Sequence, residues 1–119
     1  METTSTRKIV INKSHGEFCL SHKAFLRLRE LDQGDALQEQ DIAAYWPSGA
    51  RPDEPSLNMF GARIPRDDQK LVQVVEELRS GANGHGAELK IVEIPNEVQW
   101  KIEKSGGMEH VSETHRQWS

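Results

Sequence analysis

Residues 64–103 read IPRDDQKLVQVVEELRSGANGHGAELKIVEIPNEVQWKIE, and this stretch decides the fold. Asp67 or Asp68 is a suitable N-cap, because a carboxylate there accepts hydrogen bonds from the free amides of the first helical turn. The apolar residues that follow are spaced by three, one and three positions and are Leu71, Val74, Val75 and Leu78. This spacing predicts an amphipathic helix from Asp68 to Ser80 that buries one face against a sheet.

Three strands are predicted after this helix, and they span Glu88–Ile94, Glu97–Glu103 and Met108–Glu113. Pro95 ends the first strand. In the second strand, Val98, Trp100 and Ile102 alternate with polar residues, so one face is expected to be buried and the other exposed to solvent. The Ser105–Gly107 segment suits a tight hairpin turn. We therefore expect the three strands to form an antiparallel meander with the helix lying across it.

The segment between helix and strand, Gly81–Gly86, contains three glycines and superficially resembles a phosphate-binding loop. Phosphate loops follow a strand and open a helix, so that helix N-terminal amides face the anion. Here the order is reversed. The segment is interpreted as a helix C-cap and turn.

Upstream, Lys8–Asn12 (KIVIN) is a short β-branched run, and it predicts a strand that lies beside Glu88–Ile94. Ser21 is a suitable N-cap for a helix over His22–Leu31. The apolar residues of that helix occur at three-residue steps and are Phe25, Leu28 and Leu31. The small polar residues Met1–Thr6 are predicted to be disordered.

The middle of the chain is harder to interpret. In Ala36–Trp46, alanines, leucine and glutamines favour a helix, although Ile42–Trp46 suits extended backbone equally well. We interpret the segment as a helix. Pro47–Pro65 holds four of the five prolines, which predicts an irregular loop. Its apolar residues either anchor the loop to the domain or recognise a partner, and they are Leu57, Met59 and Phe60.

The predicted architecture is a two-layer α+β domain spanning residues 1–119, with a small antiparallel or mixed sheet and two to three helices. The element order is β-α-(α)-loop-α-β-β-β. A formal charge of -4 argues against nucleic acid as a partner, because such binding usually needs a basic face. No apolar run approaches the ~20 residues that cross a bilayer. The open edges of a small sheet would allow a homodimer.

Cys19 is the only cysteine, which suits a reducing compartment and predicts a cytoplasmic protein. Its neighbours Phe18 and Leu20 suggest a buried thiol. With His15 and His22 it forms an H-x3-C-x2-H run, but zinc sites draw on four ligands, or three and a water, in paired spacings. We therefore predict no metal site and no cofactor.

Side chains that could take part in catalysis lie close together in sequence near the C-terminal end, and they are Glu109, Glu113, His115 and Arg116. A histidine beside a carboxylate can perform acid-base catalysis, and an arginine can hold an anionic substrate. The alternative is a solvated last strand with a tail docked by Trp118. Trp100 and Trp118 either cover one end of the core or form an aromatic patch that binds a protein, as Met59 and Phe60 would on the loop.

The run from Ile64 to Glu103, together with GGMEHVSETHRQW, resembles a family of small uncharacterised proteins of bacteria and of some phages and other viruses. The family pattern is DD-x-LV-x-VVEEL, ANG, LKIVEIP, W-x-IE and E-x-HR-x-W. The match covers the last 56 residues well and KIVINKSHGEFCLS more loosely. The resemblance implies the element order and transfers no activity. Arg79-Ser80 replaces the usual glycine, and the Pro47–Pro65 loop follows no family pattern.

Two functions are compatible with these patterns. The leading hypothesis is a small non-enzymatic binding or regulatory protein with a protein partner, in one version a phage protein that antagonises a bacterial defence system. The alternative is a small hydrolase or transferase that uses the C-terminal Glu, His and Arg cluster.

Overall fold

The computed structural model describes residues 6–49, 56–96, 99–106 and 108–113. Its elements, in chain order, are β1 (Thr6–Asn12), α1 (His22–Glu30), α2 (Gly34–Gln38), α3 (Gln69–Leu78), the 3-10 turn η1 (Arg79–Ala82), β2 (Leu89–Pro95), β3 (Trp100–Ser105) and β4 (Met108–Glu113). The α+β class and the predicted element order are confirmed. The disorder prediction is wrong at Thr6, which begins β1, while residues 1–5 lie outside the described part.

Both predicted helix caps are present. The Ser21 hydroxyl accepts a hydrogen bond from the Ala24 amide at 3.1 Å, and α1 begins at the next residue. The Asp68 carboxylate accepts from the amides of Lys70 and Leu71 at 2.9 and 3.0 Å. These bonds satisfy amides that have no partner inside the helix, so they fix where α1 and α3 begin.

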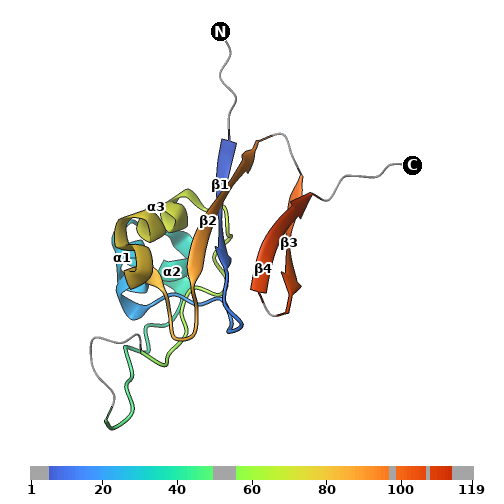
Figure 1. The fold of residues 1–119 in the computed structure, drawn as a ribbon. Coiled ribbons are helices and arrows are strands. Elements are labelled where there is room, and N and C mark those ends of the chain that lie inside the picture. Colours follow the sequence, from blue (N-terminus) through green and yellow to red (C-terminus); the bar gives the residue numbers. More distant parts are fainter. Residues whose placement is uncertain (1–5, 50–55, 97–98, 107, 114–119) are drawn as a thin grey trace.

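The helices cover one side of the β1–β2 ribbon, and the β3–β4 hairpin lies on its other side (Figure 1). Val10 of β1 belongs to the main core, where it is buried together with Phe25 and Leu28 of α1 and Leu71 and Val74 of α3. The apolar stripe predicted for α3 is therefore confirmed as a core face, with Leu78 partly buried against it.

A second apolar layer lies on the opposite face of β1. Ile9 and Ile11 are fully or almost fully buried, although they alternate with Val10 and so point away from the helices. That is the side on which the hairpin lies (Figure 1). β1 is consequently covered on both faces, which explains its unbroken apolar run.

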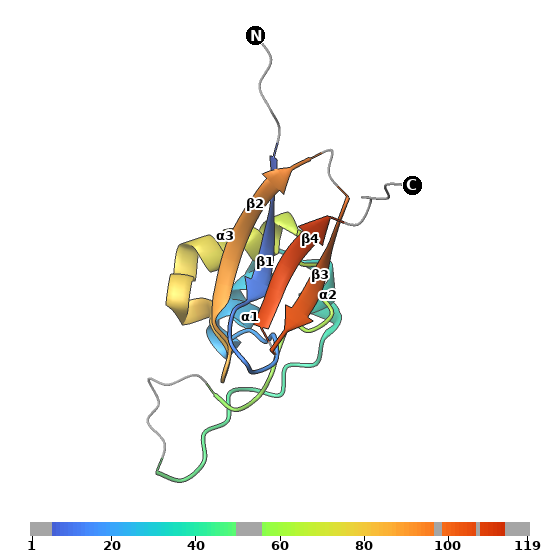
Figure 2. The same ribbon diagram turned by 45° about the vertical axis from the view of Figure 1, so that its right-hand side comes forward.

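The strand pairing differs from the predicted meander. β1 pairs antiparallel with β2, from Thr6 opposite Pro95 to Asn12 opposite Leu89. β3 pairs antiparallel with β4 in a second two-stranded sheet, and the described residues of β2 and β3 do not pair with each other. The placement of the first strand beside β2 is confirmed and the β2–β3 pairing was wrong. Because β1 occupies one edge of β2 and the hairpin approaches β1, the ribbons follow the order β2, β1, β4, β3 (Figure 2).

The helix predicted over Ala36–Trp46 is wrong beyond its first residues. α2 ends at Gln38, and Glu39 already has extended backbone angles. Ala43 has a φ of 63°, which an α-helix does not permit. The physical reason is burial: Ala36 packs in the core, whereas Ile42 and Tyr45 are 53% and 52% exposed, so no apolar face stabilises a longer helix.

Candidate functional site

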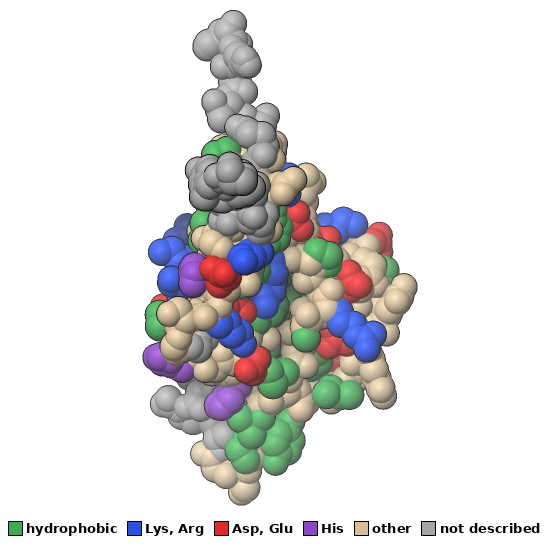
Figure 3. Space-filling view, turned by 90° about the vertical axis from the view of Figure 1, so that its right-hand side faces the viewer, with side chains coloured by type: hydrophobic (Ala, Val, Ile, Leu, Met, Phe, Trp, Pro, Cys, Tyr) green, Lys and Arg blue, Asp and Glu red, His purple; other side chains and the backbone are tan. Residues whose placement is uncertain are grey.

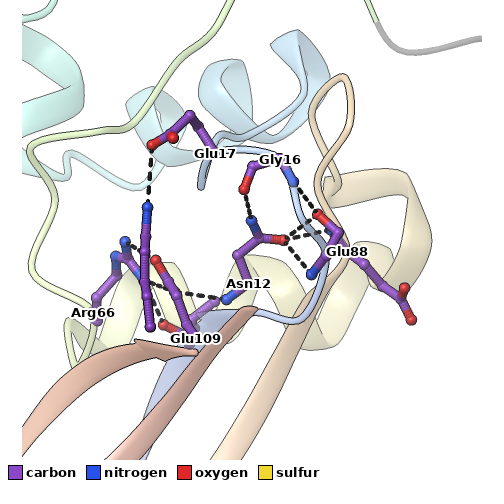
Figure 4. Close-up of polar contacts among 9 residues, drawn as sticks. Asn12, Gly16, Glu17, Arg66, Glu88 and Glu109 are labelled. Atoms are coloured by element: carbon purple, nitrogen blue, oxygen red, sulfur yellow. Dashed lines mark hydrogen bonds and ion pairs between the residues drawn. The ribbon is translucent and has the colours of Figure 1, made fainter. Parts of the chain in front are cut away.

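Glu109, the first residue of the predicted catalytic cluster, lies inside the protein and is 2% exposed (Figure 4). Its Oε1 accepts hydrogen bonds from Arg66 Nη1 at 2.6 Å and from the Asn12 amide at 2.8 Å. Its Oε2 accepts from Arg66 Nη2 at 3.1 Å. Both carboxylate oxygens are thus engaged by a bidentate arginine and a backbone amide.

Arg66 fills the space between the two ribbons. Its carbonyl accepts a hydrogen bond from the Val10 amide at 2.9 Å, and its Nη1 donates to the Val10 carbonyl at 3.3 Å. Its guanidinium carbon lies 3.6 Å from the centre of the Phe18 ring. Arg66 and Glu109 therefore cover the edge of β1 that β2 does not use, where unpaired backbone groups would otherwise remain. We call these two residues, with Asn12, the junction.

The charges of the junction are mutually stabilised. Burial raises the pKa of the Glu109 carboxyl, but the hydrogen bonds from Arg66 and from the Asn12 amide outweigh it, and the pKa lies below its usual value. The carboxylate is the stable form in the folded protein, and it is the form that Arg66 needs as a partner.

The Asn12 side chain fixes the loops beside the junction (Figure 4). Its Oδ1 accepts from the amides of Ser14 and Glu88 at 3.2 and 2.8 Å, and its Nδ2 donates to the Gly16 carbonyl at 2.7 Å. Arg66 and Asn12 were missed from the sequence. The one clue to the role of Asn12 in the sequence was its position, as a polar residue at the end of an apolar strand. The sequence around Arg66 held no comparable clue.

The remaining members of the predicted cluster are not brought to Glu109 by any described contact. His115, Arg116 and Trp118 lie outside the described residues, as does the side chain of Glu113. The catalytic role of this cluster stays a prediction, and the carboxylate of Glu109 already has structural partners.

The predicted binding residues separate into two groups. Phe60 belongs to the core, where its ring stacks on Phe25 with centroids 4.6 Å apart, so it is not a surface residue. Its burial confirms that the loop is anchored to the domain. Trp100 is half-buried on β3. Met59 is exposed and belongs to the segment described next.

Residues 40–49 and 56–59, which we call the arm, project from the domain near α2 (Figures 1 and 2). The exposed large hydrophobic residues of the arm are Ile42, Tyr45, Trp46, Leu57 and Met59. Hydrophobic side chains gather at the lower end of the molecule in Figure 3, the end from which the arm projects in Figure 2. The two sides of the arm are joined by a hydrogen bond from the Leu57 amide to the Tyr45 carbonyl at 2.9 Å.

The base of the arm is fixed by two carboxylates. The Glu39 side chain accepts from the Gly61 amide at 3.0 Å. The Asp41 side chain accepts from the Ala43 amide at 2.8 Å and bonds to the His22 ring at 2.9 Å. The Ala43 amide and the His22 ring hold the pKa of Asp41 below its usual value. The arm therefore leaves the domain in a defined direction.

A cavity of about 370 Å³ lies at the base of the arm, and its lining residues are Asp35, Gln38, Glu39, Gln40, Ala62 and Arg63. Apart from Ala62, its lining side chains are polar, and they include both charges. A second cavity of about 330 Å³ lies between the start of β1 and α3, where Lys8 pairs with Glu76 at 2.7 Å.

The three residues considered above as possible zinc ligands each contact a different group. Cys19 is buried, its Sγ donates to the His85 carbonyl at 3.4 Å, and burial raises the pKa of its thiol. His15 bonds to the Gly106 carbonyl, and His22 bonds to Asp41. Over the residues that the structure describes, no group of three or more His, Cys, Asp or Glu side chains is placed to hold a metal ion.

No protein-family model matches this sequence, and neither a curated protein nor a solved structure matches it. The family resemblance of the C-terminal run stays a prediction. Within the described ranges, no helix has the length and apolar character that crossing a membrane would require.

Proposed function

We propose that this protein is a small non-enzymatic binding module, and that its arm is the surface that a protein partner contacts. One observation carries the proposal: five large exposed apolar side chains lie on a single projecting segment. Soluble monomers rarely expose a large contiguous apolar patch unless it serves an interaction.

The residue types on the arm support the same proposal. Tyrosine and tryptophan are enriched among the residues that dominate protein binding energy, and methionine adapts its shape to different partners. Tyr45, Trp46 and Met59 supply these types in the described arm. Because Glu39 and Asp41 hold the base of the arm, docking would order fewer backbone torsions than docking of a free loop.

The resemblance of residues 64–119 to proteins of bacteria and phages supports a narrower form of the proposal. In that form the protein acts in the cytoplasm of a bacterium, and the partner is a host protein or a component of a defence system. Residues 47–49 and 56–59 of the arm lie in the loop that departs from the family pattern, and residues 40–46 lie outside both matched runs, so the identity of the partner would be particular to this chain.

A cross-linking experiment tests the proposal. A photo-reactive residue is placed at Tyr45 or at Met59 of the full chain, and a matched control places it at exposed Lys90 on β2. Irradiation in a bacterial lysate is expected to give a product of one defined mass from the arm positions and none from the control. The proposal is wrong if the arm positions give the same diffuse background as Lys90.

A further inference from the structure

We propose that the cavity at the base of the arm is a binding site for a free basic amino acid, such as lysine or arginine. The site takes the carboxylate of the ligand at Arg63 and its two cationic groups at Asp35 and Glu39. This inference goes beyond the proposed function and does not depend on it, because it concerns a small molecule and none of the exposed apolar side chains of the arm.

The charged residues of the cavity stand on backbone that the core fixes. Asp35 lies in the first turn of α2 and Glu39 is the C-cap residue of the same helix, so the two carboxylates are one helical turn apart. Between them, Ala36 is buried in the main core and holds α2 in place. On the other side of the cavity, Arg63 directly precedes Ile64, which is 2% exposed. The two sides of the cavity are therefore anchored separately.

The charges that line the cavity lack ionic partners. Over the described part of the chain, the Arg63 guanidinium forms no ion pair and no hydrogen bond. The Asp35 carboxylate accepts one hydrogen bond, from the Gln33 side-chain amide at 3.3 Å. The Glu39 carboxylate accepts from the Gly61 amide at 3.0 Å. Both donors are neutral, so neither carboxylate is compensated by a cation among the described residues. Opposite charges thus line one cavity without the N···O contact of about 4 Å that defines an ion pair.

The balance of charge selects the class of ligand. The lining carries one positive side chain, Arg63, and two negative ones, Asp35 and Glu39. A simple anion would meet two carboxylates, and a simple cation would leave the guanidinium without a partner. A metal ion is not favoured, because no group of three or more His, Cys, Asp or Glu side chains in the described ranges is placed to hold one. A basic amino acid carries one carboxylate and two cationic groups, so it complements all three side chains.

The size and polarity of the cavity suit such a ligand. Its volume of about 370 Å³ lies within the range of roughly 300–1,000 Å³ that is typical of small-molecule sites. The side-chain amides of Gln38 and Gln40 have no hydrogen bond to a described residue, so they can donate to the ligand or accept from it. A guanidinium binds a carboxylate through two parallel hydrogen bonds. We therefore expect Arg63 to fix the orientation of the ligand.

Isothermal titration calorimetry of the full chain tests the site. Lysine and arginine are expected to bind saturably, at one site per chain, with a Kd below about 1 mM. Two relatives of lysine each lack one of its charges: cadaverine has no carboxylate, and norleucine has no side-chain ammonium. Each is expected to bind about tenfold more weakly than lysine, because one charged contact is lost.

Two variants assign the contacts to side chains. Arg63→Gln is expected to weaken lysine binding about tenfold and to bind lysine and cadaverine equally, because its advantage for lysine depends on the carboxylate. Asp35→Asn keeps an oxygen that can accept from Gln33, and it is expected to weaken the binding of both compounds. Lys90→Gln and Glu88→Gln change exposed side chains outside the cavity and are the matched controls, with no expected change. Circular dichroism establishes that each variant is folded.

The outcomes separate this inference from the proposed function. A chain that neither lysine nor arginine saturates up to about 10 mM, roughly ten times the weakest affinity expected, overturns the site. Binding that Arg63→Gln and Asp35→Asn leave unchanged also overturns it, because the ligand would then lie elsewhere. A loss in Arg63→Gln that is equal for lysine and cadaverine contradicts the carboxylate contact. Cross-linking from the arm measures a protein contact, so the proposed function survives if this site fails, and the reverse also holds.

Discussion

At the junction a carboxylate and a guanidinium lie inside the protein, whereas on the arm five large apolar side chains lie at its surface. The buried charges have a full set of partners, since Glu109 bonds to Arg66 and to the Asn12 amide. The fold by itself therefore accounts for them. Nothing in the described part of the protomer accounts for the exposure of Ile42 and Tyr45 in the same way. We therefore expect the junction to stabilise the fold and the arm to bind a partner.

Glu109→Ala is expected to cause the largest loss of stability, because it leaves the mostly buried guanidinium of Arg66 without its carboxylate. Breaking one side of such a pair costs about 3 kcal/mol. Urea unfolding measures the free energy, and Glu88→Ala, at an exposed side chain, is the matched control with an expected change below about 0.5 kcal/mol. Replacement of both charges, as Arg66→Met with Glu109→Met, is expected to recover much of the loss. Equal losses in Glu109→Ala and Glu88→Ala would show that the junction is not a stabilising feature.

Gly61→Ala is expected to have the next largest effect, at the point where the arm rejoins the domain. Gly61 has a φ of 83°, and a Cβ there would clash with the side chain of Leu20. Strain and overpacking together are expected to cost about 2 kcal/mol in urea unfolding. Gly49 has a φ of 91° and open space around it. Gly49→Ala is therefore the control, because it adds backbone strain without a clash, and its expected loss of stability is about 1 kcal/mol. A smaller loss for Gly61→Ala than for Gly49→Ala would contradict the close approach to Leu20.

The pH dependence of stability is expected to differ between wild type and Glu109→Gln. The pKa of Glu109 is lower in the folded than in the unfolded protein. Its contribution to the free energy of unfolding is therefore fully present above about pH 5 and is lost as the pH falls through the folded pKa. Glu109→Gln is expected to be less stable at neutral pH and to lose less stability on acidification. The measurement is urea unfolding from neutral pH to about pH 3, and parallel pH profiles for the two proteins would refute the ionised junction.

Ile42→Ser and Tyr45→Ser are expected to have the smallest effect on stability, below about 0.5 kcal/mol, because both side chains are already half in water. The same substitutions are expected to abolish the cross-linked product from Met59. A loss of stability comparable to that of Glu109→Ala would place these residues in the core and would remove the contrast between junction and arm.

Local patterns predicted the elements well. The stripe of α3, the caps at Ser21 and Asp68 and the alternation before the last hairpin each depend on residues a few positions apart. The junction does not, because Arg66 and Glu109 are separated by 43 positions and Asn12 and Glu109 by 97. A charged residue that will meet its partner across such a distance looks the same in sequence as a solvated one, which is why the sequence placed Glu109 either in a catalytic cluster or on a solvated last strand.

The arm was mispredicted for a related reason. Alanine and glutamine give residues 36–46 a helical propensity, but a short helix needs an apolar face with something to pack on. Whether such a surface exists is a property of the tertiary fold. The pairing of β1 rather than β3 with β2 is equally non-local, since it joins Thr6 to Pro95.

The two covered faces of β1 have a consequence for biosynthesis. This strand is synthesised before its ladder partner, which begins at Leu89, and before Glu109, whose carboxylate accepts a hydrogen bond from the Asn12 amide. Ile9 and Ile11 therefore wait for residues 89–113 before the neighbouring strands of the folded protein are in place. Contacts of this sequence separation form slowly, and uncovered apolar strands aggregate readily. The nascent chain is consequently expected to depend on chaperones until the final hairpin closes over its first strand.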